Sequence, residues 1–251
     1  MLTTERQAEI LKLLGQKNAV TVLELTALLH ASESTVRRDL NDLHRQGLLN
    51  KVHGGATTLE NMVYRSTEDA VAVRREQQCS EKEQIGRYAA SLIRPGDFVY
   101  LDAGTSTEYM IEHIAEKDAV FVTNAVSHAQ KLVQKNLTVY ILGGRFKLAT
   151  EAIVGPQALD DLQKYNFTKG FFGANGVHQK SGCTTPDPAE ATVKHAALSR
   201  CKEKYILADP TKFNQVSPIT FCELAEATIL TTRLRDAGWK NIKNIREVMQ
   251  T

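Results

Sequence analysis

The fold is decided by one stretch of the chain, Ser32-Glu33-Ser34-Thr35-Val36-Arg37-Arg38-Asp39-Leu40-Asn41-Asp42-Leu43. Val36, Leu40 and Leu43 stand at i, i+4 and i+7, so they form a narrow apolar stripe along one side of a predicted helix. The opposite side carries hydroxyl, guanidinium and amide groups, which are the types that reach base edges and phosphates in a DNA major groove. Taken alone, the stretch fits an ordinary amphipathic helix with a solvated face better. Its neighbours reverse that preference.

The residues before this stretch predict two further helices. Between residues 6 and 16, apolar residues recur at helical spacing. Thr21 and Glu24 then form a capping box, which is the signal for the start of a short second helix. Three turn residues (30–32) lead into the third helix, and Ser32 is its N-cap. Helix, short helix, turn and a third helix with a polar face are typical of a helix-turn-helix, a DNA-binding motif.

A β-hairpin is predicted for residues 47–56, directly after the third helix. Lys51 and Val52 can form a short strand, and Gly54-Gly55 permits a tight return. Three helices and a hairpin make a winged helix-turn-helix, which we expect to occupy residues 1–57. Asp39 is expected to brace an arginine, because phosphate would repel its carboxylate. The predicted DNA-binding residues are Ser32, Ser34, Thr35, Arg37, Arg38, Asn41, Arg45, Lys51 and His53.

Composition narrows the classes of protein to which the chain can belong. Its 251 residues suffice for one small and one full-sized domain, and 42% hydrophobic and 24% charged residues are typical of soluble globular proteins. The net charge is only +2, so DNA binding must come from a local patch. The four cysteines show no metal-ligand spacing, and no apolar run approaches membrane-spanning length. We therefore expect a cytoplasmic protein without a cofactor, a metal site or a membrane partner.

The second part of the chain begins after a polar stretch. Residues 58–79 mix charges without sustained periodicity, which indicates an interdomain linker, and Ser80 and Glu83 form a second capping box at the start of a helix. Strand and helix patterns then alternate through residues 80–251, which predicts an α/β domain with a mostly parallel sheet covered on both faces. Patterns typical of buried strands lie at residues 98–101, 120–122, 139–142, 170–172, 205–208 and 229–230.

Polar and glycine-rich clusters follow five of these strands. They are Asp102-Ala103-Gly104-Thr105-Ser106-Thr107, Thr123-Asn124, Gly143-Gly144, Gly173-Ala174-Asn175-Gly176 and Asp209-Pro210-Thr211-Lys212. Ligands of parallel α/β sheets bind beyond the carboxyl ends of the strands. At residues 104–107, backbone N–H groups and hydroxyls at a helix start would suit a phosphate. A single Gly-Thr turn is more often structural, but five clusters at equivalent positions favour a ligand site.

Both parts of the chain resemble the DeoR family of bacterial sugar-operon repressors. In the first part, the resemblance rests on residues 32–40, on Gly47-Leu48 and on His53-Gly54-Gly55-Ala56. In the second part, the motifs that match the family's sugar-phosphate sensor domain are Asp102-x-Gly104-Thr105, Val122-Thr123-Asn124, Leu142-Gly143-Gly144, Gly173-x-x-Gly176, Glu190-Ala191-x-x-Lys194 and Asp209-x-x-Lys212-Phe213. That sensor domain is similar in fold to ribose-5-phosphate isomerase and the CoA transferases. Residues 100–105, 151–155 and 184–187 look most like the fructose-operon branch, whereas Ser106 and Cys183 depart from the commoner residues of the family.

The resemblance implies roles for the polar clusters. Residues 104–107 would bind the phosphate of a sugar phosphate, with Lys194 or Lys212 as the cationic partner. For Glu190 and Lys194, an exposed i, i+4 pair is the alternative. The predicted effector-binding residues are Asp102, Gly104, Thr105, Ser106, Thr107, Thr123, Asn124, Gly143, Gly144, Gly173, Asn175, Asp187, Glu190, Lys194 and Lys212.

The function implied by the resemblance is repression of a sugar-utilisation operon. A homodimer or homotetramer would bind double-stranded operator DNA, and a sugar phosphate, with fructose 1-phosphate as the first candidate, would release it. The rival is an isomerase-like enzyme in which Asp102, Glu190 and Lys194 transfer protons. An isomerase has no need of a helix-turn-helix, so the first part of the chain argues against that rival. The alternative that the protein activates transcription stays open, because the position of the operator decides whether a bound regulator represses or activates.

Overall fold

The computed structural model describes residues 3–17, 19–46, 48–52, 54–57, 63–64, 71–234, 236–239 and 242–248. The chain divides into two compact units, residues 1–62 and residues 63–251. Each unit has hydrophobic core clusters of its own. Within the described residues, no helix combines the length and the apolar character needed to cross a membrane.

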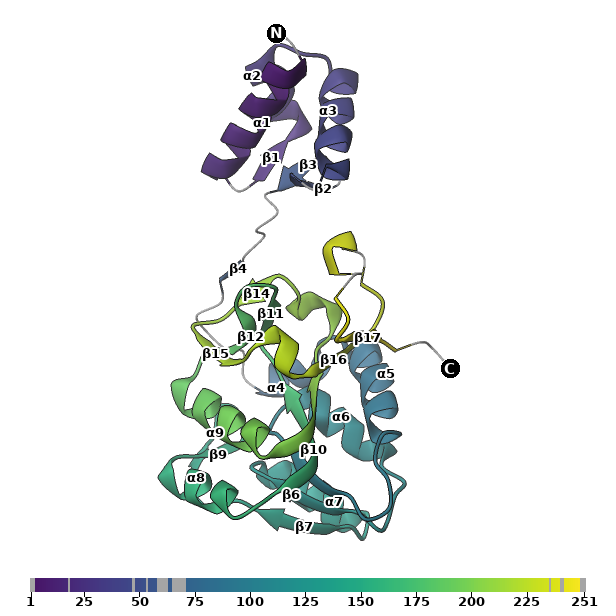
Figure 1. Cartoon of the computed structure of the whole chain (residues 1–251), viewed down its shortest axis with the longest axis vertical. Coiled ribbons are helices and arrows are strands. Elements are labelled where there is room, and N and C mark those ends of the chain that lie inside the picture. The colour runs from purple at the N-terminus through teal and green to yellow at the C-terminus, as the bar shows by residue number, and fades with distance from the viewer. Residues whose placement is uncertain are drawn as a thin grey trace. The chain divides into compact units, whose positions relative to one another are not determined.

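The first unit is a winged helix-turn-helix, as predicted (Figure 1). Its elements are α1 (Thr3–Lys17), β1 (Ala19–Thr21), α2 (Val22–Leu29), α3 (Glu33–Arg45), β2 (Asn50–Val52) and β3 (Gly55–Thr57). Strands β2 and β3 form the predicted hairpin, and β1, which was not predicted, pairs with the other side of β3. The first capping box is present, because the N–H of Glu24 donates to Thr21 Oγ1 at 3.1 Å and the N–H of Thr21 donates to Glu24 Oε2 at 2.9 Å.

The second unit is built on a parallel sheet. Its strands are β5 (Phe98–Leu101), β6 (Val120–Thr123), β7 (Thr138–Ile141), β10 (Phe167–Gly173), β13 (Cys201–Leu207), β16 (Thr228–Thr231) and β17 (Ile245–Glu247). They lie in the order β17-β16-β13-β10-β5-β6-β7, and every pairing among them is parallel. The chain order reverses between β5 and β10, since β6 and β7 continue on one side and β13, β16 and β17 on the other. This point is where doubly wound sheets bind ligands.

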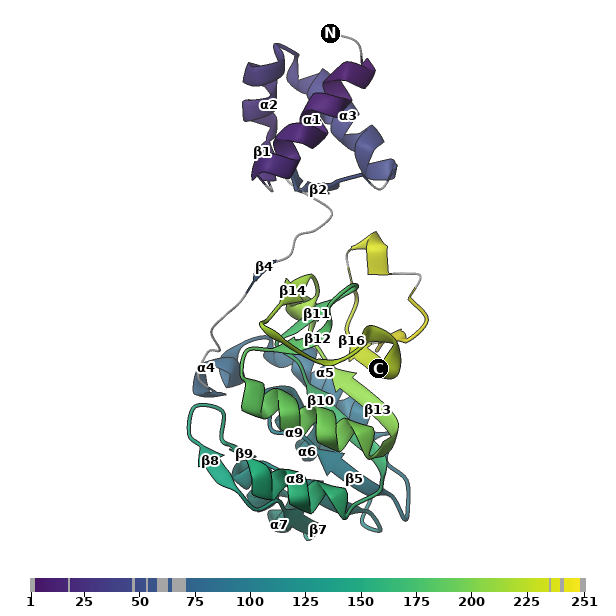
Figure 2. The ribbon, with the colours of Figure 1, turned by 60° about the vertical axis from the view of Figure 1, so that its left-hand side comes forward.

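Helices cover both faces of this sheet, as the alternation of patterns predicts (Figure 2). They are α5 (Cys79–Ala90), α6 (Thr105–His113) and α7 (Val126–Gln134) on one face, and α8 (Pro156–Gln163) and α9 (Pro188–Ser199) on the other. Successive residues of a strand point to opposite faces. Leu101 and Phe171 accordingly join the cluster under α5, α6 and α7, and Tyr100 and Phe172 join the cluster under α8 and α9.

Two details of the prediction were wrong. Strand β7 is not buried, because it is the last strand of the sheet and pairs only with β6; Tyr140 is 52% exposed and Ile141 is 46% exposed. Helix α5 does not start at a capping box. It starts after Gln78, which has a φ of 52° and makes no side-chain cap bond. Ser80 Oγ instead accepts a hydrogen bond from the side chain of Gln84 at 3.2 Å.

The stretch that we expected to be linker contributes two elements to the second unit. β4 (Val63–Tyr64) pairs with β14 (Gln215–Val216), and α4 (Val71–Glu76) leads into α5. The N–H of Val71 donates at 3.1 Å to the carbonyl of Ala149, in the loop between β8 (Arg145–Lys147) and β9 (Ala152–Val154). The remaining elements include β11 (Gly176–His178), β12 (Gly182–Thr185), β15 (Ile219–Cys222) and the 3₁₀ helices Pro210–Lys212, Leu224–Glu226 and Ala237–Trp239.

Candidate DNA-binding surface and ligand cavity

Helix α3 presents the polar face that its sequence predicts. Val36, Leu40 and Leu43 are buried in the core of the first unit. The helix begins at the predicted N-cap, because the N–H of Thr35 donates to Ser32 Oγ at 3.3 Å. Among the predicted DNA-binding residues, those that are exposed are Ser32, Ser34, Arg37, Arg38, Asn41, Arg45 and Lys51, and Thr35 is partly buried. His53 lies outside the described residues.

Residues of α3 are held in place by polar contacts with α1, with the hairpin and within the helix itself. Asp39 is buried and accepts from Arg6 of α1 at 2.5 and 3.0 Å, so the expectation that Asp39 braces an arginine is confirmed. Lys51 of β2 donates to Asn41 Oδ1 at 2.7 Å, which joins the hairpin to the helix. Arg37 pairs with Glu33 at 3.1 Å. Within the described part of the chain, the guanidinium of Arg38 has no such partner, so its charge is available to a ligand.

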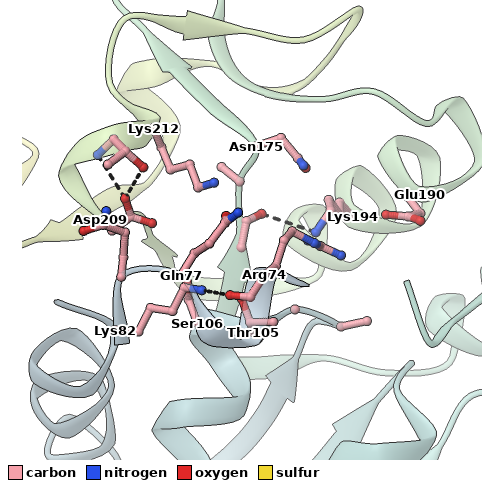
Figure 3. Close-up of a pocket in the computed structure, with 16 residues that line it drawn as sticks. Arg74, Gln77, Lys82, Thr105, Ser106, Asn175, Glu190, Lys194, Asp209 and Lys212 are labelled. Atoms are coloured by element: carbon pink, nitrogen blue, oxygen red, sulfur yellow. Dashed lines mark hydrogen bonds between the residues drawn. The ribbon is translucent and has the colours of Figure 1, made fainter. Parts of the chain in front are cut away.

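A cavity that is partly open to solvent lies in the second unit at the point where the strand order reverses. The loops that follow β5 and β10 form its floor. Its lining residues are Arg74, Gln77, Gln78, Lys82, Ala103, Gly104, Thr105, Ser106, Gly173, Ala174, Asn175, Glu190, Lys194, Asp209, Thr211 and Lys212. Figure 3 shows Arg74, Lys82, Lys194 and Lys212 around the same space, from four different elements.

The N-terminus of α6 opens on this cavity. Gly104 precedes the helix, and Thr105 and Ser106 of its first turn line the cavity. The first backbone N–H groups of a helix have no helical partner, so they can bind an anion. Thr107 has another role: its hydroxyl donates to the carbonyls of Asp102 at 2.7 Å and Gly104 at 2.8 Å, which fixes the turn.

Lys194 is held at the cavity floor by a buried carboxylate. Its ammonium donates to Asp102 Oδ2 and, at 3.3 Å, to the carbonyl of Gly173. Asp102 is 1% exposed and Lys194 is 5% exposed. Lys194 therefore pairs with a buried carboxylate, and the alternative of an exposed i, i+4 pair between Glu190 and Lys194 is wrong. Burial raises the pKa of Asp102, and the charge of Lys194 opposes that rise. Asp102 therefore acts as the counter-ion of Lys194 and does not itself line the cavity.

A second set of carboxylates lies beside Lys194 on α9. Glu190 is buried and accepts from Lys147 Nζ and from Thr150 Oγ1, both at 2.6 Å. Asp187 caps the helix, because it accepts the N–H of Glu190 at 2.9 Å, and it also pairs with Lys147 at 3.0 Å. Glu190 lines the cavity and Asp187 does not.

The cavity has four cationic lining residues, and two of them, Arg74 and Lys82, were not predicted from the sequence. Lys82 of α5 is 3% exposed, and its ammonium donates to the carbonyl of Arg74. Burial is the main cause that lowers the pKa of Lys82, and the charges of Arg74 and Lys212 lower it further, while Asp209 raises it. Arg74, Gln77, Gln78 and Lys82 were not predicted because they lie in or just after the stretch that was expected to be linker. The basic and amide side chains of these four residues were the sequence signal that could have identified them as ligand-binding candidates.

The fold does not bring all the predicted effector residues to the cavity. Those that line it are Gly104, Thr105, Ser106, Gly173, Asn175, Glu190, Lys194 and Lys212, and those that do not are Asp102, Thr107, Thr123, Asn124, Gly143, Gly144 and Asp187. In the sheet, β5 lies between β10 and the two strands β6 and β7. The loops that follow β6 and β7 therefore do not line the cavity. Asn124 supports it instead, since its Oδ1 accepts the N–H of Ala103 at 2.8 Å.

Comparisons with known proteins agree with this arrangement. The family described as "DeoR-like helix-turn-helix domain" matches residues 6–62, and the family described as "DeoR C terminal sensor domain" matches residues 77–233. The uncharacterized HTH-type transcriptional regulator FruR of Bacillus subtilis (strain 168) is 42% identical over 96% of this chain and 95% of its own. The lactose phosphotransferase system repressor of Staphylococcus aureus (strain N315) is 36% identical over 92% of each chain.

Among solved structures, ribose 5-phosphate isomerase A from Methanocaldococcus jannaschii covers 53% of each chain with 14% identity and a TM-score of 0.40, a likeness from which we conclude nothing further. The two family matches and the two relatives cover both units described above. The chain belongs to the DeoR family of transcriptional regulators.

Proposed function

We propose that this protein represses a sugar-utilisation operon and that a phosphorylated sugar, bound in the cavity of the second unit, lowers its affinity for operator DNA. The observation that carries the proposal is the convergence of Arg74, Lys82 and Lys212 on the cavity at the N-terminus of α6. Cationic side chains and the amides of a helix start both favour a phosphate. A neutral sugar has no negative charge to offer these groups.

The buried lysine of this cluster makes the case stronger. Lys82 lies at a site where burial and neighbouring cations lower its pKa, so its charged form is poorly stabilised there. An anion within ion-pair distance would stabilise that form. We therefore expect sugar-phosphate affinity to fall as pH rises through the lowered pKa of Lys82, because the deprotonated amine no longer attracts the phosphate.

Two other lining residues suit a sugar. Glu190 and Asn175 offer oxygen acceptors to hydroxyl groups, and both side chains are already oriented, by Thr150 at 2.6 Å and by Thr185 at 3.1 Å. The names of the relatives, FruR and lactose phosphotransferase system repressor, support a carbohydrate ligand. Fructose 1-phosphate is our first candidate.

The DNA-binding half of the proposal rests on α3. Its exposed face carries Arg38, Asn41 and Arg45, which would enter a major groove with the hairpin residue Lys51 beside the phosphates. A homodimer or homotetramer would place two such helices in successive major grooves. Release then requires that the sugar phosphate bind the DNA-free conformation more tightly, and DNA must weaken sugar-phosphate binding by the same factor.

The test is calorimetry on the full chain with fructose 1-phosphate, fructose and inorganic phosphate, each with and without operator DNA selected from a random pool. Thr105→Val removes one hydroxyl at the start of α6 and should weaken fructose 1-phosphate binding by about 1.5–3 kcal/mol, the value of a hydrogen bond to a charged group. Operator affinity should stay unchanged, so the variant should repress without being induced.

Thr192→Val is the matched control, since Thr192 is exposed on α9 and its hydroxyl donates to the carbonyl of Pro188 at 2.8 Å. This control should bind fructose 1-phosphate as the unaltered protein does. Equal affinities for fructose and fructose 1-phosphate would refute the phosphate site. Sugar-phosphate binding that is indifferent to operator DNA would refute the release mechanism.

A further inference from the structure

Among the described residues, α4 is the first helix of the second unit, and it supplies part of the cavity lining. The chain reaches it after the stretch that follows the DNA-binding unit. Arg74 belongs to α4, and Gln77 and Gln78 follow it directly; all three line the cavity. A ligand in the cavity would therefore contact the helix that follows β4 in the chain, the strand that pairs with β14 at the start of the second unit.

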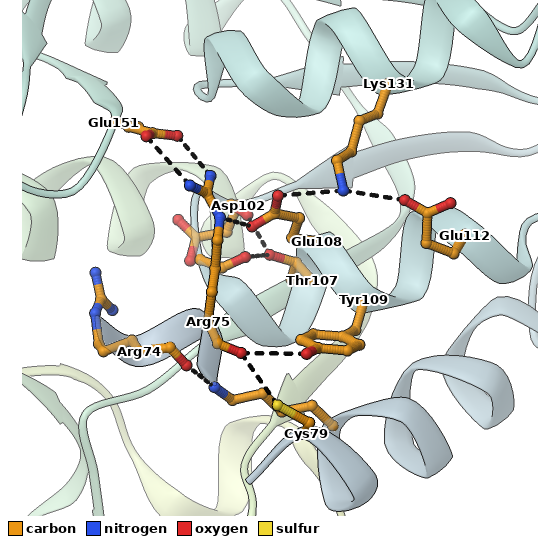
Figure 4. Close-up of polar contacts among 12 residues, drawn as sticks. Arg74, Arg75, Cys79, Asp102, Thr107, Glu108, Tyr109, Glu112, Lys131 and Glu151 are labelled. Carbon is orange, nitrogen blue, oxygen red and sulfur yellow. Dashed lines mark hydrogen bonds and ion pairs between the residues drawn. The ribbon is translucent and has the colours of Figure 1, made fainter. Parts of the chain in front are cut away.

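Arg75 fastens α4 to the rest of the second unit without lining the cavity (Figure 4). Its guanidinium donates to Glu108 Oε2 at 2.8 Å and to Glu151 Oε2 at 2.8 Å. Glu108 is buried one turn after the start of α6, where its N–H donates to the carbonyl of Gly104 at 3.0 Å. Lys131 of α7 pairs with the other oxygen of Glu108 at 3.2 Å. One guanidinium thus joins α4 to the helix whose N-terminus forms the proposed phosphate site.

The backbone at the end of α4 is held as well. The carbonyl of Arg75 accepts from Tyr109 Oη at 3.1 Å and from Cys79 Sγ at 3.3 Å, and the carbonyl of Arg74 accepts from Lys82. Tyr109 belongs to α6 and Lys82 lines the cavity. The end of α4 is therefore held by α6 and by one residue of the cavity.

The loop of residues 148–151 contacts both Glu190, which lines the cavity, and helix α4. Thr150 donates to Glu190 of the cavity wall at 2.6 Å. On either side of Thr150, the carbonyl of Ala149 accepts the N–H of Val71, and Glu151 binds Arg75. Glu151 has a φ of 54°, a left-handed backbone that is unfavourable for glutamate, so the carboxylate is held in place at a cost to the chain. A displacement of Glu190 would therefore displace this loop and, with it, the contacts of the loop with α4.

We propose that Arg75 is a positioning residue that couples the cavity to the DNA-binding unit, by holding α4 docked in the conformation that binds the sugar phosphate. This inference rests on the proposed function. Docking of α4 completes the cavity with Arg74 and Gln77, and release of α4 removes them. The sugar phosphate therefore binds the docked state more tightly, and operator DNA favours the released state.

The test compares Arg75→Gln with Arg87→Gln in the full-length protein. Arg87 pairs with Glu83 at 3.6 Å on the exposed face of α5, so the control removes the same chemical contact away from α4. Because only the docked fraction binds, Arg75→Gln should raise the Kd for fructose 1-phosphate about tenfold or more, although Arg75 does not line the cavity. Its operator affinity without sugar should rise or stay the same, and Arg87→Gln should change neither value.

Hydrogen exchange separates coupling from a purely structural role. In the unaltered protein, fructose 1-phosphate should slow amide exchange in residues 71–79, and in Arg75→Gln that protection should be smaller. Glu151→Gln should raise the Kd too, but by less, because it removes only one of the two ion pairs of Arg75. The double variant should lose less than the sum of the two single losses, because both variants remove the ion pair between Arg75 and Glu151.

Three results would overturn the inference. If the unaltered protein binds fructose 1-phosphate and Arg75→Gln binds it equally well, Arg75 does not couple the cavity to α4, and the proposed function stands. Additive losses for Arg75→Gln and Glu151→Gln would also refute the coupling. If the unaltered protein binds neither fructose 1-phosphate nor inorganic phosphate, the proposed function fails and the inference fails with it.

Discussion

The two units present their functional side chains in contrasting ways. On α3 the candidate DNA-contacting groups, such as Arg38 and Asn41, are exposed above a buried apolar stripe. At the cavity, Asp102 and Lys194 are buried and stand 92 residues apart in the chain. The comparison teaches that the polar face of a helix is encoded in the periodicity of that helix, whereas a cavity depends on residues that only the fold brings together.

The same contrast has energetic consequences. An exposed arginine keeps its water in the folded state, so its removal costs binding and little stability. A buried charge has lost its water and depends on its partner, so its removal also costs stability. Substitutions in the two units should therefore separate into changes of operator affinity and changes of both folding and ligand binding.

The largest effect should come from Lys194→Met. The substitution leaves Asp102 buried without its counter-ion, and breaking a buried ion pair lowers the free energy of unfolding by about 3–5 kcal/mol. The loss should depend on pH. Because burial raises the pKa of Asp102 above its value in the unfolded chain, the folded state binds this proton more tightly. Stability of the variant should therefore fall as pH rises through that raised pKa, and the deficit should shrink in acid.

Urea unfolding at several pH values measures this loss. Arg45→Met supplies the control from the first unit, since Arg45 is highly exposed and pairs with Asp42 on the same helix. This control should leave the free energy of unfolding nearly unchanged at every pH. Similar losses for the two variants would contradict the contrast between the units.

A smaller effect, on operator binding alone, should follow Arg38→Ala. If Arg38 binds a guanine, affinity should fall by about 1–3 kcal/mol and the loss should be specific to one base pair. If it binds phosphate, the loss should be similar for all DNA sequences and the salt dependence should weaken. Gel-shift titrations with operator variants at several salt concentrations distinguish the two.

Lys12→Ala is the control for Arg38→Ala, because Lys12 of α1 is exposed and pairs with Glu9 at 3.1 Å. Thermal unfolding of both variants should match that of the unaltered protein. Operator affinity equal to that of the unaltered protein would exclude Arg38 from the interface.

The sequence predicts a region well where its structure depends on residues close together in the chain, and poorly where it depends on residues far apart in the chain. The winged helix-turn-helix and the order of strands and helices were predictable, because buried stripes such as Val36 and Leu40 repeat at the helical period. β1 was missed, since three residues are too few to show a period. Lys82 was missed because it lies on a helix and does not follow a strand in the sequence, and only the packing of α5 brings it to the cavity.

One sequence signal gave opposite outcomes in the two units. Thr21-x-x-Glu24 forms its capping box, as its local geometry predicts. Ser80-x-x-Glu83 does not: α5 begins earlier, after Gln78, and Glu83 Oε1 lies 2.7 Å from His113 Nε2 of α6. Tertiary contacts therefore override a local preference in the second unit and leave it intact in the first.

The smallest predicted effect sharpens this last difference. Thr21→Ala removes the N-cap side chain of α2 and should lower the free energy of unfolding by about 1 kcal/mol, because the N–H of Glu24 loses its acceptor. Ser80→Ala should have almost no effect, since the hydroxyl of Ser80 caps no helix. Urea unfolding followed by circular dichroism measures both. A loss for Ser80→Ala as large as that for Thr21→Ala would mean that the second capping box forms in solution, and that local sequence governs both units alike.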